Sequence, residues 1–201
     1  MGSAPPERSV ASRDVSTADP AAPISVGIRR AGAGDAERLA EVAAATFALA
    51  CPPHTTQESI ATFVRDVLSP ERFADYLADP TRDLFLAEDG DEAVVVGYAM
   101  VVTGEPSDGD VRAALTLRPT SELSKIYVLP GRHGGGVARA LMDASLDAAR
   151  ERGSRGAWLG VNQLNERAQR FYGKSGFTRV GTKHFLVGDR YEDDYVFERA
   201  L

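Results

Sequence analysis

A glycine-rich turn lies at the centre of the stretch Tyr127-Val128-Leu129-Pro130-Gly131-Arg132-His133-Gly134-Gly135-Gly136-Val137-Ala138. A predicted strand leads into this turn and a predicted long helix follows it. At such a helix N-terminus several backbone N–H groups lack helical partners, and the helix dipole favours negative charge. Glycines let the backbone approach an anion closely, so a pyrophosphate is the natural ligand. A tight strand–helix connection without a ligand explains the glycines alone equally well.

Two common nucleotide-binding motifs do not fit this turn. The G-x-G-x-x-G pattern of dinucleotide-binding folds is absent, and the turn lies late in the chain. A Walker A loop is absent too, because no Gly-Lys-Ser or Gly-Lys-Thr follows the glycines. The sequence therefore disfavours both of these classes of protein.

A second informative segment, residues 162–177, reads as a strand end, a helix and a glycine stop. Helical spacing places Asn165, Ala168 and Tyr172 roughly along one face. An amide, a small residue and a phenol in that order form a suitable wall for a long polar cofactor.

The remaining elements predict one mixed α/β domain over residues 24–201, after a flexible tail over residues 1–23. Strands are expected at residues 24–28, 83–88, 94–102, 121–129, 157–161, 177–187 and 191–198. Helices are expected at residues 57–68, 135–152 and 165–175, with two more that begin after Asp35 and Ser69. The polar segment 104–120 is expected to be a loop.

Composition limits the class of protein further. With 201 residues, of which 43% are hydrophobic and 26% charged, the chain is long enough for one well-buried domain. No apolar run approaches the roughly 18 residues of a membrane span, and the N-terminus lacks the apolar region of a secretory signal. The single cysteine, Cys51, excludes an internal disulfide. It fits a reducing compartment, so a cytoplasmic location is expected.

Charge and histidine placement disfavour two kinds of binding. A net charge of −6 argues against a nucleic-acid binder. An acidic cleft would concentrate a cationic substrate, although an acidic surface more often serves solubility. No metal site is expected, because no carboxylate or cysteine stands at ligand spacing from His54, His133 or His184.

Together the two segments resemble the signature of the GNAT acetyltransferase superfamily. In that family a Gln/Arg-x-x-Gly-x-Gly/Ala turn binds the CoA pyrophosphate, and the matching residues here are His133, Gly134, Gly135, Gly136, Val137 and Ala138. The family's Asn-x-x-Ala-x-x-Phe-Tyr-x-x-x-Gly-Phe pattern matches Asn165, Ala168, Phe171, Tyr172, Gly176 and Phe177. His133 stands where the family has Gln or Arg, a departure that bears on affinity for CoA more than on the fold.

The resemblance covers about residues 24–201. It implies the GNAT fold, a central, mostly antiparallel sheet of about seven strands flanked by helices. It also implies acetyl-CoA as co-substrate and an amine as acceptor. Within the superfamily the chain is most similar to PaiA-like acetyltransferases, which act on spermidine and spermine. Many relatives pair through late strands, so a homodimer is compatible with the resemblance.

The resemblance also assigns catalytic roles. A lysine-like amine has a pKa of about 10.4 and must lose a proton before it attacks a thioester, so the site needs a proton acceptor. Glu122 is the candidate base, and a solvated or salt-bridged strand carboxylate is an equally weighted alternative. Tyr172 is the candidate acid that protonates the departing CoA thiolate. The alternative for Tyr172 is a core phenol that only orients the cofactor.

Further contacts with the cofactor follow from the same resemblance. The thioester carbonyl is expected to meet backbone N–H groups of Ile126, Tyr127 and Val128. Asn165 is expected to bind the pantetheine or its surroundings. Lys174 is a candidate for contact with a CoA phosphate, although a solvent-facing lysine is the commoner case.

Three function classes remain open from the sequence. The first is an enzyme in which an amine attacks acetyl-CoA directly, without a covalent enzyme intermediate. Its acceptor could be a polyamine, an aminoglycoside-like amine, an amino acid, or a protein or peptide amine. The second is a non-catalytic acyl-CoA sensor, and the third is an interaction module with no CoA site.

Overall fold

The computed structural model of the chain describes residues 26–51, 54–90, 93–132, 136–187 and 190–201. The predicted tail at 1–23 and the expected start of the domain at 24 lie outside these residues. Within them, strands form one sheet in the order β1-β2-β3-β4-β5-β7-β6. The strands are β1 (Val26–Arg30), β2 (Arg82–Asp89), β3 (Val94–Thr103), β4 (Thr120–Val128), β5 (Gly156–Asn162), β6 (Thr178–Val187) and β7 (Arg190–Ala200).

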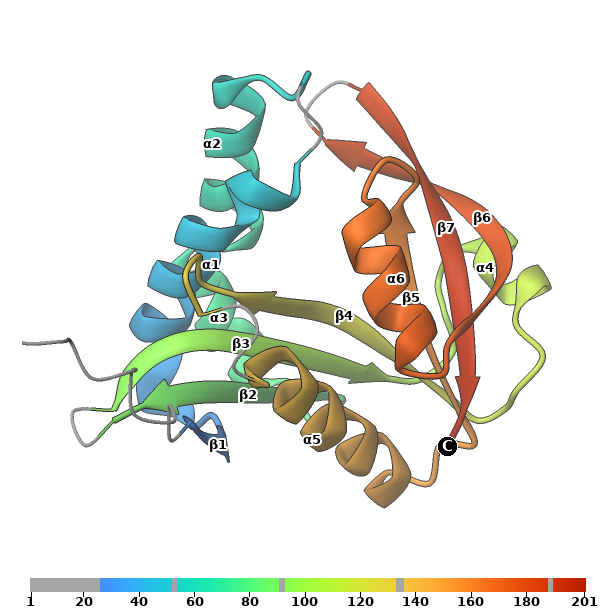
Figure 1. The fold of residues 1–201 in the computed structure, drawn as a ribbon, viewed down its shortest axis with the longest axis horizontal. Coiled ribbons are helices and arrows are strands. Elements are labelled where there is room, and N and C mark those ends of the chain that lie inside the picture. Colours follow the sequence, from blue (N-terminus) through green and yellow to red (C-terminus); the bar gives the residue numbers. More distant parts are fainter. Residues whose placement is uncertain (1–25, 52–53, 91–92, 133–135, 188–189) are drawn as a thin grey trace, which may run out of the picture.

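Neighbouring strands of this sheet run antiparallel, except that β4 and β5 are parallel. The helices are η1 (Ala33–Asp35), α1 (Ala36–Ala50), α2 (Gln57–Val67), α3 (Pro70–Ala78), α4 (Gly109–Ala114), α5 (Val137–Glu151) and α6 (Glu166–Lys174). Figure 1 shows α1, α2 and α3 gathered on one side of β2–β4 and α5 on the other. The predicted mixed, mostly antiparallel sheet flanked by helices is confirmed.

Helix starts follow the capping chemistry of the sequence. The side chain of Thr56 accepts a hydrogen bond from the Ser59 N–H at the start of α2, and Ser69 does the same for Arg72 at the start of α3. Asp35 also precedes α1, but its carboxylate makes no capping bond. It accepts hydrogen bonds from the Arg29 guanidinium and the Gly32 N–H instead.

The prediction of a loop over residues 104–120 is wrong in part, because α4 forms within it. The side chain of Asp108 caps this helix by accepting hydrogen bonds from two backbone N–H groups. Val111 is fully buried and packs in a small cluster with Leu115 and Trp158. A helix this short offers too few apolar positions for a helical period to be recognised in the sequence.

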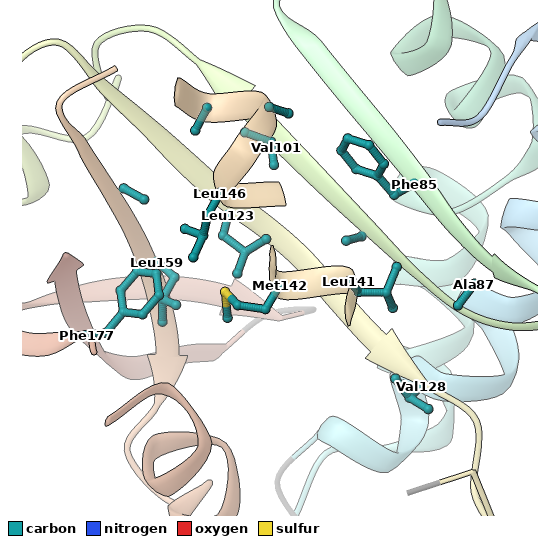
Figure 2. Close-up of a cluster of buried hydrophobic side chains, with 14 of the residues drawn as sticks. Phe85, Ala87, Val101, Leu123, Val128, Leu141, Met142, Leu146, Leu159 and Phe177 are labelled. Carbon is teal, nitrogen blue, oxygen red and sulfur yellow. The ribbon is translucent and has the colours of Figure 1, made fainter. Parts of the chain in front are cut away.

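Two hydrophobic cores lie on opposite faces of the sheet. One lies beneath α5, and Figure 2 shows Leu141, Met142 and Leu146 among side chains that include Leu123 and Leu159. The other packs α1, α2 and α3 against β2 and β3. Each core fixes one wall of the region described next.

No helix in the described parts of the chain is long and apolar enough to cross a membrane. In those same parts, no group of three or more His, Cys, Asp or Glu side chains is placed to hold a metal ion.

Candidate active site

The parallel strands β4 and β5 are paired only at their beginnings. Residues Thr120–Glu122 pair with Gly156–Trp158, and the register between these two strands goes no further in the described residues. Figure 1 shows the two strands running apart beyond this point. From Leu123 onward β4 is paired with β3 alone. The backbone N–H and C=O groups on the other edge of β4 are therefore available to a ligand.

A cavity of about 780 Å³ lies where β4 and β5 diverge. That volume suits a ligand of cofactor size. Its walls come from α1, α2, β3, β4, the start of α5, β5, α6 and one residue each from β6 and β7. The N-terminal helices and the C-terminal strands thus meet around one space.

An irregularity in β4 decides which of its side chains face α1–α3. Met100 pairs with Lys125 and Val101 with Leu123, so Ser124 is an extra residue with no partner in the register. Such a bulge shifts the alternation of faces by one position. Leu123 packs in the core beneath α5, whereas Tyr127 packs with α1–α3. The shift therefore places Glu122, Lys125 and Tyr127 on the same face of β4.

The start of α5 lies at the cavity and has the features of an anion-binding end. Gly136 precedes the helix with φ of +80°, a backbone conformation that favours glycine. No side chain caps this end, and Gly136, Val137 and Ala138 all line the cavity. The first N–H groups of the helix therefore point toward the space without helical partners. This cradle fits the pyrophosphate of CoA.

Arginines lie close to the anion-binding end of the cavity. Arg132 and Arg139 line the cavity but are ion-paired with Asp89 and Asp143. Arg167 on α6 also lines the cavity, is exposed, and makes no hydrogen bond or ion pair within the described parts of the chain. Its guanidinium is therefore available to a phosphate.

Most of the predicted cofactor residues meet at this cavity. The lining includes Ile126, Tyr127, Val128, Gly136, Val137, Ala138 and Asn165. His133, Gly134 and Gly135 lie outside the described residues. The amide oxygen of Asn165 accepts a hydrogen bond from the Ala168 N–H at 3.0 Å, so this oxygen caps α6. Lys174 is exposed at the C-terminal end of α6 and does not belong to the described lining of the cavity.

Glu122 lines the cavity on the side of α1–α3. Burial raises the pKa of its carboxyl group above the ordinary value, although Lys183, Lys125 and Arg82 act in the opposite direction. Among the described residues Glu122 makes no ion pair and its carboxylate accepts no hydrogen bond. The geometry therefore presents a carboxylate with cations nearby but no direct partner, rather than a salt-bridged one.

Tyr172 lines the cavity from α6. Burial raises the pKa of its phenol, and the nearby Tyr127 and Asp194 raise it further. The hydroxyl is therefore fully protonated at neutral pH and able to donate a proton or a hydrogen bond. The ring also packs against Phe171 and Phe177, so Tyr172 has a place in the core as well.

Several polar residues of the cavity have no role in the sequence analysis. They are Tyr98, Lys125 and Lys183. Lys183 reaches the cavity from β6, where it stands directly opposite Asp194 of β7. The pairing of distant strands brings these groups together, and no local pattern in the sequence announces that pairing.

A known protein family matches the part of the chain that forms this site. A model of the Acetyltransferase (GNAT) family matches residues 45–177, which include most of the cavity lining. The chain belongs to the GNAT acetyltransferase family. It is therefore an N-acetyltransferase, as the sequence resemblance predicted.

Relatives of this GNAT enzyme match it over most of its length. A protein of Mycobacterium tuberculosis (strain ATCC 25618 / H37Rv) named as an uncharacterised N-acetyltransferase is 50% identical over 83% of this chain and 98% of its own length. An uncharacterised N-acetyltransferase of Lactobacillus delbrueckii subsp. lactis is 27% identical over 78% of this chain and 86% of its own.

A solved PaiA N-acetyltransferase of Thermoplasma acidophilum, in complex with coenzyme A, shares the fold. Its TM-score is 0.67 at 18% identity, over 88% of this chain and 99% of that one. At that identity the likeness supports the fold alone.

Proposed function

We propose that this GNAT enzyme transfers the acetyl group of acetyl-CoA to a primary amine by direct attack of the amine on the thioester. One observation carries the proposal. A single cavity joins the open edge of β4 and the N-terminus of α5 to the carboxylate of Glu122, which has no direct partner in the described residues. The first two features suit a long anionic thioester, and the third suits an amine that must lose a proton.

Glu122 accepts a proton from the acceptor ammonium, directly or through one water. Its pKa is raised by burial, which brings it closer to neutral pH and strengthens it as a base. The neutral amine then forms the new N–C bond with the carbonyl carbon. Backbone N–H groups among Ile126, Tyr127 and Val128 on the open edge of β4 stabilise the negative charge that develops on the carbonyl oxygen.

Tyr172 acts on the leaving group, the sulfur of CoA. As the C–S bond breaks, the electron pair moves to sulfur and the phenol of Tyr172 donates a proton or a hydrogen bond to the thiolate. Its raised pKa makes full proton transfer uphill from a phenol to a thiolate of pKa about 8.5. A hydrogen bond from the phenol to the departing sulfur is therefore the larger part of its contribution.

The residues that hold the CoA moiety are proposed from the same cavity. The N–H groups at the start of α5, together with His133, Gly134 and Gly135 of the sequence signature, bind the pyrophosphate. Arg167 binds a phosphate group, a role that the sequence resemblance gave to Lys174. Asn165 shapes the pantetheine channel mainly by capping α6.

The chemical class of the acceptor amine is a separate hypothesis. The PaiA-like resemblance favours a polyamine, and an aminoglycoside or a peptide amine belongs in the same panel. A non-catalytic acyl-CoA sensor is the competing class of function. A homodimer and a cytoplasmic location are further expectations, which light scattering and cell fractionation test.

Two glycines offer a matched test of the cofactor site. Gly136 and Gly153 have φ of +80° and +79°, and neither has a neighbour within 4 Å of an added Cβ. Alanine at either position therefore introduces similar backbone strain. Gly136 lies at the start of α5 beside the cavity, whereas Gly153 follows the other end of the helix.

The experiment measures the rise in melting temperature with acetyl-CoA and the release of CoA thiol with an amine panel. Wild type and Gly153→Ala should both be stabilised by acetyl-CoA, and Gly136→Ala should lose most of that stabilisation. Binding without turnover across the panel would favour the sensor. No thermal response in wild type would contradict the proposed function.

A further inference from the structure

Two opposite charges on one face of β4 lack a direct partner in the part of the cavity around Glu122, which is the acceptor half. Glu122 and Lys125 both line the cavity, and the bulge at Ser124 puts them on the same face. Each acts on the other through space, but neither side chain makes an ion pair or a side-chain hydrogen bond within the described residues. Both are enclosed by protein yet open to the cavity. Charged groups held in this way are candidates for direct contact with a ligand.

The surroundings of Lys125 direct its ammonium toward α3. Its Nζ lies 5.9 Å from the centre of the Tyr76 ring. The guanidinium of Arg82 lies over the same ring at 4.8 Å and is ion-paired with Asp79 at 2.8 Å. Because Arg82 already has an anionic partner, Lys125 is the cation on this wall that can receive an anion from a ligand.

A count of charges around the acceptor half argues against a highly cationic ligand. Arg82 acts on Glu122 as well, but its charge is paired with Asp79. The other charged side chains there are Glu122, Lys125, Lys183, which also acts on Glu122, and Asp194, which stands opposite Lys183. These four charges sum to zero. A polyamine would bring several positive charges to two lysines, with no excess of carboxylates to receive them.

We infer that the acceptor is a zwitterion, an amine that also carries a carboxylate, with its amine at Glu122 and its carboxylate at Lys125. The inference rests on the proposed acetyl transfer and assigns the substrate class of the same site. An amino acid has these two groups on neighbouring atoms. Lys125 then positions the acceptor, and Glu122 removes its proton.

Two other features of the cavity agree with an amino-acid acceptor. The hydroxyl of Tyr98 is buried and has no hydrogen-bond partner in the described part of the protein. Tyr98 lies on β3 two residues from Met100, the partner of Lys125, so it is a diagonal neighbour of Lys125 and lines the same cavity. Apolar side chains line the side of α1 and α2, where the rings of Phe47 and Phe63 stack at 4.3 Å. This apolar wall suits an acceptor with an apolar side chain.

The test compares amino acids with the same molecules lacking the carboxylate. Suitable pairs are L-leucine with isopentylamine, L-phenylalanine with 2-phenylethylamine, and L-lysine with cadaverine, with spermidine as an additional probe. Release of CoA thiol gives kcat and KM for each. We expect at least one amino acid to exceed its decarboxylated partner about tenfold or more in kcat/KM, as loss of a charge-assisted contact predicts.

Lys125→Met removes the charge and keeps the length of the side chain. It should raise KM for the preferred amino acid about tenfold, leave kcat within a few-fold, and abolish the preference over the decarboxylated amine. Arg150→Met is the control, because Arg150 is an exposed cation near the other end of α5, ion-paired with Asp147. It should leave both constants unchanged.

The outcomes distinguish failure of the zwitterionic acceptor from failure of acetyl transfer itself. Turnover of spermidine or of the decarboxylated amines alone would overturn the zwitterion and leave acetyl transfer standing. A preference for the amino acid that survives in Lys125→Met would overturn the role of Lys125. No turnover with either class, in an enzyme that still binds acetyl-CoA, would count against the zwitterion and the proposed transfer together.

Discussion

Charged side chains have direct ion-pair partners in one region of this enzyme and lack them in another. At the edge of the sheet, where β1 meets β2, Arg29 is bound to Asp35 at 2.7 Å and to Glu88 at 2.8 Å. Arg38 adds a second ion pair to Glu88 at 2.8 Å. In the cavity, Glu122 and Lys125 share a face of β4 and have no such partner in the described residues.

The pKa values of the two regions move in opposite directions. The guanidinium of Arg29 holds the pKa values of the Asp35 and Glu88 carboxyl groups below their ordinary ranges, because its hydrogen bonds outweigh their partial burial. Burial dominates in the cavity instead. It raises the pKa of Glu122 and lowers that of Lys125 to about 8.

The contrast separates charges that stabilise the fold from charges that are retained for a ligand. A carboxylate whose pKa is lowered by a partner favours the folded state at neutral pH, whereas one whose pKa is raised by burial disfavours it. Uncompensated groups in a cavity are candidates for function for this reason.

The largest expected effect is on turnover. Tyr172→Phe removes the hydroxyl in the cavity and keeps the ring that packs against Phe177. We expect kcat to fall by about a hundredfold, the lower part of the range for a lost general acid, while acetyl-CoA still raises the melting temperature. Steady-state release of CoA thiol checks the rate. A kcat within twofold of wild type would mean that Tyr172 only packs and orients.

A smaller effect is expected from breaking the ion pairs at the sheet edge. Arg29→Met leaves the carboxylates of Asp35 and Glu88 without their main cation, so urea unfolding at pH 7 should show a loss of about 1–3 kcal/mol. The values of kcat and KM should not change, because Arg29 is not part of the described cavity lining.

The pH dependence of that loss gives an independent check. The stabilisation from lowered carboxyl pKa values is present above the unfolded values of 3.8 and 4.5, and it disappears as pH falls through the folded values. The difference between wild type and Arg29→Met should therefore shrink below pH of about 4. A difference that stays constant down to pH 2 would assign the loss to packing.

The smallest effect is a stability difference in the cavity that depends on alkaline pH. Lys125 has a folded pKa of about 8 against an ordinary value of 10.5, so its buried charge destabilises the fold most below pH 8. The unfolded chain binds more protons between these values, and wild type should gain stability across that interval. Lys125→Met lacks this gain. Its advantage over wild type should shrink as pH rises from 8 to 10.5, and a constant difference would contradict the explanation.

The order of the strands and helices was largely predictable, because local signals mark it. Turn glycines, the helix start at Ser69, and alternating apolar residues placed every strand and most helices close to their observed bounds. The short helix α4 was not predicted, because one buried valine shows no helical periodicity in the sequence. Residues of the signature around Gly136 and Tyr172 also line the cavity, and their role in binding the cofactor stays a prediction.

The acceptor side was less predictable, since it depends on pairing between distant strands. Nothing in Glu122-Leu123-Ser124-Lys125 announces that Ser124 is a bulge, yet this bulge puts Glu122 and Lys125 on one face. Lys183 reaches the cavity from β6, far along the sequence. The family resemblance can nominate Glu122 as a base, but only the sheet register reveals its cationic neighbours.

The most direct test of the contrast is to measure activity and stability together in Glu122→Gln, which keeps the shape and removes the charge. The account predicts that kcat falls about a hundredfold or more. It also predicts that the melting temperature at pH 7 rises, because the folded protein no longer buries a carboxylate that lacks a direct partner. Unchanged kcat, or a lower melting temperature, would contradict the claim that this charge is retained for catalysis.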